Sequence, residues 1–212
     1  MSRETEKANR SIEIKPADWS DQRTWDLVAT HFEYFTALEI GTTFNQPPSL
    51  ETYASTLKDS NNSLFVAWDT ASEPQIPLGC GALRTFTSQI PGHDGGLVGN
   101  AGEVRSMHTI AQARRRGVGK LLLRHIEQTA KEVGLNRLYI ETGVSNAVSL
   151  TWTTSFRGKS NLCGVLLLTM EFKWLEGYAA ARRMYSDAGF EQCASFAEYT
   201  DHADVLFMVK EI

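Results

Sequence analysis

The sequence has little cysteine, no long apolar run and no strong excess of charge. Its three cysteines, Cys80, Cys163 and Cys193, have no metal-ligand spacing, so neither a metal site nor a disulfide framework is expected. No apolar run is long enough to span a membrane, and the polar start MSRETEKANRS differs from a secretory signal. A formal net charge of -4 gives no general reason to expect nucleic acid. We therefore expect a cytoplasmic protein with no metal, no membrane association and no nucleic-acid partner.

Alternating and helical patterns of hydrophobic residues divide the chain into strands and helices. Turn residues separate them, notably SEPQIP and the glycine-rich loop at 93–96. We expect strands at 11–16, 63–69, 78–86, 101–110, 136–142 and 205–212, and helices at 21–38, about 49–53, 117–133 and 177–189. Strands and helices alternate without a repeat or a linker, so we predict one α/β (α+β, mixed-sheet) domain at 11–212 behind a disordered tail at 1–10.

A strongly amphipathic helix is predicted at 117–133 and ends at Gly134, the residue type that commonly follows a helix. It begins in the stretch QARRRGVGK, residues 112–120, which joins three arginines to two glycines. A helix start offers unpaired N–H groups and the positive end of a dipole, and glycines let an anion approach them. This stretch is therefore predicted to hold a phosphate. The apolar face of the helix consists of Val118, Leu121, Leu122, Ile126, Ala130 and Val133.

The spacing of this stretch excludes two common phosphate loops. Arg114 and Leu121 stand where a Walker loop has glycine and Ser or Thr. Leu122 stands where a dinucleotide fingerprint has its third glycine. What remains is Arg114-x-x-Gly117-x-Gly119 between a strand and a helix. This pattern resembles the acyl-coenzyme A pyrophosphate loop of the GNAT acetyltransferases.

The resemblance extends over most of the chain from Ser11 onward. Residues 103–143 look like the family's fourth strand, third helix and fifth strand, and AARRMYSDAGFEQC looks like the helix that follows. The closing segment from Phe196 is similar to the tail of a bacterial branch of uncharacterised GNAT N-acetyltransferases. The resemblance implies a central, mostly antiparallel sheet whose fourth and fifth strands splay apart, flanked by helices.

The same resemblance implies a cofactor site for acetyl-coenzyme A, which would serve as co-substrate without a metal. The strand end Met107, His108 and Thr109 would pair its backbone with the pantetheine arm, and the Met107 N–H would polarise the thioester carbonyl. The pyrophosphate would be held by the loop formed by Arg114, Arg115, Arg116, Gly117, Val118, Gly119 and Lys120.

Two catalytic residues are implied as well. Tyr185 matches the tyrosine that protonates the departing sulfur, and a phenol with a pKa near 10 keeps its proton at neutral pH. Glu103 is the candidate base for the amine, directly or through water, with Glu141 in reserve. Either glutamate could instead pair with Arg105, and His108 could relay a proton or be packed and hydrogen-bonded.

Two departures from the family pattern stand out. Tyr178 occupies the position, seven residues before the tyrosine, where many members have asparagine, and Asn146 lies in foreign sequence and is not given that role. The larger departure is an atypical insertion at about 144–173, with Glu171 as its single acidic residue. It opens Val-Ser, which GTGAGT encodes, so it is either a translated unspliced intron or a genuine insertion at the mouth of the acceptor site.

The favoured interpretation is an N-acetyltransferase that moves an acetyl group to an amine of a small molecule or peptide by direct attack. A non-catalytic acyl-coenzyme A binding module, inactivated by the insertion, is the alternative, and an adaptor that binds protein through the insertion is a third. The stretch HFEYFTALEIGTTFNQPP suggests an aromatic wall near the acceptor without identifying it. Because dimers are common in the family, a homodimer is also compatible with the resemblance.

Overall fold

The computed structural model describes residues 11–39, 48–143, 173–199 and 205–212. The predicted tail at 1–10 and all of the predicted insertion except Lys173 lie outside these ranges, and Asn146 lies outside them too. Within them the helices are α2 (Gln22–Glu39), α3 (Leu50–Leu57), the short 3-10 helix η1 (Ala111–Ala113), α4 (Val118–Glu132) and α5 (Lys173–Asp187). No helix in the described part of the chain is both long enough and apolar enough to cross a bilayer.

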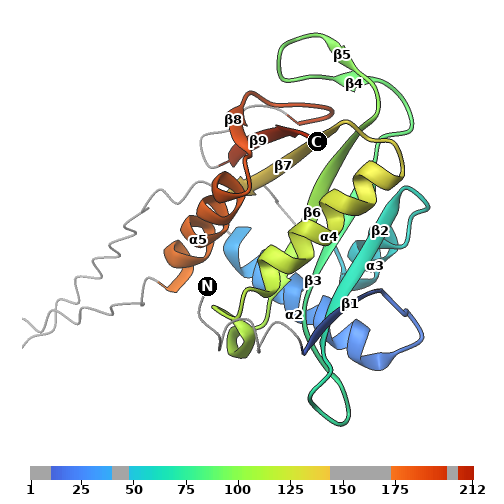
Figure 1. The fold of residues 1–212 in the computed structure, drawn as a ribbon, viewed down its shortest axis with the longest axis vertical. Helices are drawn as coiled ribbons and strands as arrows, with labels where there is room; N and C mark the ends of the chain where they lie inside the picture. Colours follow the sequence, from blue (N-terminus) through green and yellow to red (C-terminus); the bar gives the residue numbers. More distant parts are fainter. Residues whose placement is uncertain (1–10, 40–47, 144–172, 200–204) are drawn as a thin grey trace, which may run out of the picture.

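A seven-stranded sheet forms the centre of the described residues, in the order β1-β2-β3-β6-β7-β9-β8 (Figure 1). Every neighbouring pair is antiparallel except β6 and β7, which are parallel, so the predicted mixed and mostly antiparallel sheet is confirmed. The strands are β1 (Ile12–Pro16), β2 (Asn62–Asp69), β3 (Ile76–Thr85), β6 (Ala101–Thr109), β7 (Arg137–Gly143), β8 (Glu191–Cys193) and β9 (Val205–Glu211).

The sequence patterns missed only short elements and some boundaries. The loop predicted at 93–96 lies in a small hairpin of β4 (Ile90–Pro91) and β5 (Leu97–Val98), and β8 was not predicted either. These strands have two or three residues, too few for an alternating pattern to be recognised. Ser49 caps α3 from outside, because its side chain accepts a hydrogen bond from the Thr52 amide.

Alternation along β2 divides the core between two layers of helix. Phe65 and Ala67 pack in the cluster that contains the buried face of α4, whereas Leu64, Val66 and Trp68 pack with α2 and α3. Figure 1 shows α4 running across the sheet, with α2 in the lower part of the view and α3 beside β2. The sheet is therefore buried on both sides, as expected for a sheet flanked by helices.

The buried face of α4 differs from the predicted apolar face, most clearly at the C-terminal end of the helix. Val118, Leu122, Ile126 and Ala130 are buried as expected, whereas Leu121 is only half-buried and Leu123 is buried instead. Val133 is 57% exposed, because it is the C-cap residue and lies beyond the last helical turn. Gly134 follows with a φ of 81°, which a glycine adopts without the strain of a side chain and which ends the helix as predicted.

Strands β6 and β7 separate after four paired positions. The pairing runs from Ala101 opposite Arg137 to Val104 opposite Ile140, whereas both strands continue further. Figure 1 shows them diverging toward the end of the molecule where the loop before α4 lies. The predicted splay of these two strands is confirmed.

A bulge lies just beyond the point of separation. The register of β3 against β6 shifts between Cys80 and Ala82, and Ser106 on the bulged strand has a φ of 52°. Gly81 makes the bulge compatible with the core, because a Cβ at this position would lie 2.5 Å from the Met107 sulfur. The bulge thus turns the last residues of β6 relative to the first ones.

Close approach of β3 to the end of β6 yields a stability prediction. A Cβ at Gly79 would lie 2.3 Å from the His108 carbonyl oxygen, a backbone atom that cannot swing aside. Gly79→Ala is therefore expected to force the two strands apart and to lower the free energy of unfolding by about 1–3 kcal/mol, measured by urea denaturation. Gly99→Ala is the matched control, because its Cβ would meet only the Gln89 side chain at 3.7 Å. Equal urea midpoints for the two variants would contradict the prediction.

Candidate functional site

The loop between β6 and α4 presents backbone amides at the start of the helix. Ala113 is buried and anchors the loop, Arg114 is extended, and Arg115 and Gly117 take positive φ angles of 64° and 83°. Gly117 is the N-cap of α4 and makes no side-chain capping bond, so the cap residue does not satisfy the first amides of the helix. A turn of this kind before a helix N-terminus is a concave set of N–H donors that suits an anion.

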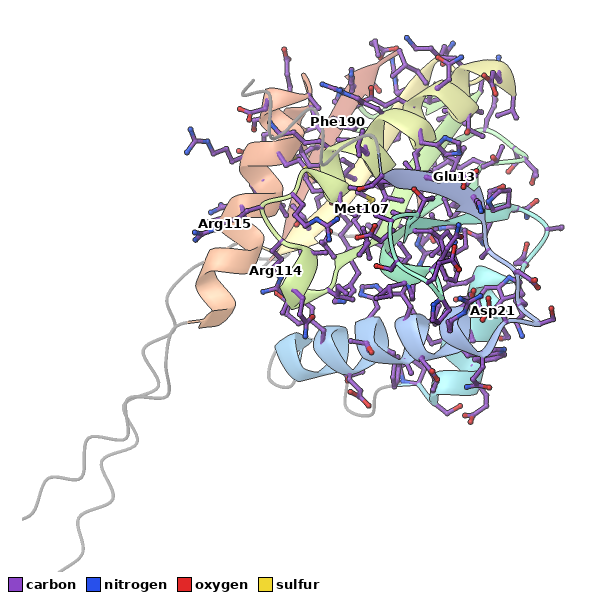
Figure 2. The ribbon with its side chains drawn as sticks, turned by 60° about the horizontal axis from the view of Figure 1, so that its bottom comes forward. Glu13, Asp21, Met107, Arg114, Arg115 and Phe190 are labelled. Carbon is purple, nitrogen blue, oxygen red and sulfur yellow. The ribbon has the colours of Figure 1, made fainter. Side chains whose placement is uncertain are left out.

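Two of the four predicted cations face outward at this loop. The Arg114 guanidinium lies 5.6 Å from the Tyr34 ring centre, and its Nε donates weakly to the Thr109 carbonyl oxygen at 3.4 Å. Arg115 is exposed and has no hydrogen-bond or ion-pair partner in the described ranges. In Figure 2 Arg114 lies above α2, and Arg115 lies on the side of the loop nearer α5. Both are placed to receive an anion.

The other two predicted cations are already paired. Arg116 donates to Asp69 at the end of β2 at 2.8 Å, and this hydrogen bond holds the pKa of Asp69 below its usual value. Lys120 contacts Asp187 of α5 at 3.1 Å, with both side chains about half exposed. The structure therefore separates four residues that look equivalent in the sequence.

Gly119 has a packing role that the sequence did not reveal. A Cβ at this position would lie 2.9 Å from the sulfur of Met184, so the glycine lets α5 approach the first turn of α4. Tyr185, the next residue, is 4% exposed and belongs to the main hydrophobic core. Its hydroxyl has no hydrogen-bond partner among the residues that the structure describes. Burial raises the pKa of Tyr185, so the phenol keeps its proton at neutral pH.

Glu103 is enclosed on the face of the sheet opposite α4. Its carboxylate is 2% exposed and accepts a hydrogen bond of 2.7 Å from the Tyr199 hydroxyl. Arg84 of β3 donates to it at 3.4 Å, and Arg105 lies 3.7 Å away. Burial raises the pKa of Glu103 and outweighs these three stabilising contacts. The pairing with Arg105 foreseen from the sequence is present, but it is the longest of the three.

Glu141 lies near Glu103 on the diverging strand. Glu103 is opposite Tyr139, and Glu141 follows two residues later on the same face of β7. The side chain of Glu141 is exposed, whereas Glu103 is not. The pKa of Glu141 is also raised, first because surrounding protein removes water from the carboxyl group and then because of the charge on Glu103. The structure thus brings the two candidate bases together and gives only one of them access to solvent.

His108 lies in an aromatic group between β6 and the first helices. Its ring centre is 5.3 Å from that of His31 and 5.7 Å from that of Tyr34, which extends the aromatic wall suggested by the sequence. Tyr53 of α3 adds a hydroxyl contact of 2.8 Å to Ser106 at the bulge. The Nε2 atom of His108 is buried and has no hydrogen-bond partner in the described part of the chain.

Several of these residues had no recognisable signal in the sequence. Tyr199, Arg84 and Asp69 are far from the loop and from Glu103 along the chain, and neither their type nor their spacing distinguishes them from surface residues. Folding brings them into contact with predicted site residues. Only homologous sequences or a structure can reveal such pairings.

The two buried histidines predict a pH dependence of stability. Burial lowers the pKa of His31 to about 3 and that of His108 to about 4, whereas the unfolded value is 6.5. The unfolded chain therefore binds more protons below pH 6.5, so stability is complete above that pH and falls toward pH 4. His31→Gln should reduce this slope by up to about 1.4 kcal/mol per pH unit, measured by urea unfolding from pH 4.5 to 7.5. An unchanged slope would contradict burial of neutral His31.

Comparison with known proteins gives consistent results. A model of the acetyltransferase (GNAT) family matches residues 19–153, more than half of the chain. The chain is 25% identical over 202 residues to the uncharacterised N-acetyltransferase YsnE of Bacillus subtilis, covering 95% of this chain and all of that protein. It is 29% identical over 111 residues to an IAA acetyltransferase of Azospirillum brasilense, covering 48% of this chain and 66% of that one.

Solved structures share the fold at low sequence identity. A GNAT-family acetyltransferase of Staphylococcus aureus matches with a TM-score of 0.59 at 15% identity, covering 94% of this chain and 98% of that one. A Bacillus subtilis acetyltransferase solved in complex with CoA matches with a TM-score of 0.55 at 13% identity, covering 95% and 99%. Together with the splayed strands and the loop before α4, the match of the family model shows that this chain belongs to the GNAT family of acetyltransferases.

Proposed function

We propose that this chain transfers an acetyl group from acetyl-coenzyme A to a primary amine of a small molecule or peptide by direct attack. The observation that carries the proposal is the position of the anion-binding loop at the open end of the splayed strands β6 and β7. A phosphate-bearing cofactor held at the loop can extend its arm along β6 toward Glu103 and Glu141. Membership in the GNAT family supports the reaction type.

The residues of the loop fit the cofactor. Arg115 and Gly117 take positive φ angles just before α4, whose first amides have no partner within the helix, and the exposed Arg114 and Arg115 add charge for the pyrophosphate. Residues 107–109 lie on the part of β6 that β7 does not pair, so their backbone can accept the pantetheine arm as an added strand. The CoA complex of the structurally similar Bacillus subtilis acetyltransferase supports this assignment.

Acid and base roles follow from the surroundings of three residues. Tyr185 donates its proton to the departing thiolate, a role supported by its raised pKa and by its position on α5 beside Gly119. Glu103 and Glu141 accept the proton of the incoming ammonium group, because both carboxyl groups have raised pKa values and therefore bind a proton more readily. The Met107 N–H polarises the carbonyl that the amine attacks.

The alternative of a non-catalytic coenzyme A binding module has no observation in its favour among the described residues. It requires the loop but gives no reason for a buried carboxylate, a second carboxylate beside it and a buried phenol. The relative from Azospirillum brasilense is named for its action on IAA, but the identity is too low to transfer that acceptor to this chain.

Cofactor binding provides the first test, with a matched pair of arginines. Saturation with acetyl-coenzyme A at a hundred times its Kd should stabilise the protein by about 2.7 kcal/mol, visible as a higher Tm. Arg115→Gln should weaken binding about tenfold, because it removes an unpaired charge from the loop. Arg116→Gln should change affinity less than Arg115→Gln but lower the Tm of the free protein, because it breaks the contact with Asp69. Absence of any shift in the unsubstituted chain would refute the proposal.

Tyr185→Phe tests catalysis separately from binding. It removes one hydroxyl while keeping the ring in the core next to Phe190. We expect kcat to fall by about 10²–10⁴-fold with little change in acetyl-coenzyme A affinity, since general acid catalysis contributes that much. Steady-state assays of CoA release combined with thermal shifts measure both quantities. A variant with normal kcat would show that Tyr185 is only a core residue.

A further inference from the structure

The segment at 194–199, between β8 and the last strand, closes over Glu103. Phe196 is 1% exposed and stacks on Tyr139 of β7 with ring centres 4.3 Å apart. The Tyr199 ring lies 5.1 Å from Phe196 and 5.8 Å from Phe207 of β9. These two contacts, with Phe196 itself held by Tyr139, leave the Tyr199 ring little freedom, so packing determines where its hydroxyl lies.

Backbone contacts hold the same segment in place. The Ala197 amide donates to the Pro91 carbonyl oxygen of β4 at 2.8 Å, and the Tyr199 amide donates to the Phe196 carbonyl oxygen at 3.0 Å. Ala197 has a φ of 52°, a conformation that a non-glycine residue adopts only where its surroundings require it. The segment is therefore a built turn that delivers Tyr199 to a fixed position.

At that position the Tyr199 hydroxyl reaches the Glu103 carboxylate. It donates to Glu103 at 2.7 Å. For Glu141, burial and the charge of Glu103 raise the pKa, while Arg105 and a hydrogen bond from Tyr199 act against them. A phenol has one proton to donate, so it can stabilise only one of the two carboxylates fully at a time. Burial and the neighbouring negative charge raise the pKa of Tyr199 itself, so this proton stays on the phenol.

The surrounding charges favour one shared proton. Charged and polar groups surround Glu103 from four elements: Arg84 on β3, Arg105 on its own strand, Tyr139 and Glu141 on β7, and Glu198 and Tyr199 on the closing segment at 194–199. Arg84 is also paired with Glu198. When every group is ionised, the three glutamates exceed the two arginines by one negative charge. Arg84 holds the pKa of Glu198 below its usual value against the effect of burial, so the excess negative charge favours uptake of one proton by the pair Glu103 and Glu141.

We propose that Tyr199 is a positioning residue for acetyl transfer. It fixes Glu103 beside Glu141, so that the two carboxylates accept one proton as a pair. The exposed Glu141 faces the amine. The inference rests on the proposed function. An N–H bond of the ammonium group breaks, its proton goes to a carboxylate oxygen, and the electron pair left on nitrogen forms the new N–C bond. The sulfur leaves with its electron pair and takes the proton of Tyr185. The nitrogen loses its second proton as the amide forms, and this proton passes through solvent to the Tyr185 phenolate, while the carboxylate pair returns its proton to water.

A titration that needs no acceptor tests the pair directly. The full chain is labelled with ¹³C at the glutamate carboxyl carbons and titrated by NMR, and Glu103→Gln and Glu141→Gln assign the two signals. Tyr199→Phe should move the Glu103 titration upward by about one pH unit, because the carboxylate loses a charge-assisted hydrogen bond. Glu103→Gln should move the Glu141 titration downward, because a like charge is removed.

Tyr139→Phe is the matched control. Its hydroxyl belongs to the same aromatic cluster but contacts His93 at 3.3 Å and Arg137 at 3.4 Å rather than a carboxylate. The Glu103 titration should stay close to that of the unsubstituted chain. An unchanged titration in Tyr199→Phe, or an equal shift in Tyr139→Phe, would overturn the positioning role.

The activity arm uses acetyl-coenzyme A with a polyamine, α-amino acids and a lysine-containing peptide as probes, detected as free CoA thiol. The acid limb of the kcat/KM profile should move upward by about one pH unit in Tyr199→Phe, with acetyl-coenzyme A affinity unchanged, and should stay in place in Tyr139→Phe. An unmoved acid limb in Tyr199→Phe overturns the inference even if acetylation is rapid. Lack of turnover on every probe despite cofactor binding counts against the proposed function, whereas the NMR titration still decides whether Tyr199 organises the pair.

Discussion

The separation of β6 from β7 after Val104 and Ile140 is the constraint on which the rest of the site depends. Parallel strands normally continue their hydrogen bonds until one of them ends, but here both continue unpaired to each other. The bulge at Ser106 lies just past the last paired position and twists the end of β6 away. An unpaired strand edge inside a sheet carries backbone donors and acceptors that need partners. The fold thus creates the place where a ligand chain can complete the sheet.

Along β6 the chemical character changes in an order that matches acetyl transfer. Glu103 stands at the last paired section, where the closing segment excludes water from its carboxylate. Residues 107–109 follow with their unpaired edge, and the amides and outward arginines of the loop come next. One strand and the loop behind it therefore arrange the proposed proton acceptor, the proposed binding edge and the proposed anion site in sequence.

Burial rather than charge sets most of the protonation states at this site. It keeps His31 and His108 neutral and Tyr185 and Tyr199 protonated, and it outweighs two nearby arginines at Glu103. Aromatic rings supply much of that burial. Rings of α2 and α3 lie around His108, and rings of the closing segment at 194–199 lie around Glu103. The same rings that exclude water also hold the polar groups in position, so proton transfer and rigidity have a common origin.

The sequence by itself determined the periodic and local features. Alternation predicted the central strands, the apolar stripe predicted α4, and the two glycines with three arginines predicted an anion-binding loop, because each of these depends on residues within a few positions of one another. The patterns failed where an element was too short, as in β8, or where a residue lies just past a helix end, as Val133 does. Only the tertiary structure decided which arginines are paired, that Glu103 is enclosed while Glu141 is exposed, and that Tyr199 donates to Glu103. These outcomes depend on contacts between residues up to 96 positions apart, for which periodicity carries no information.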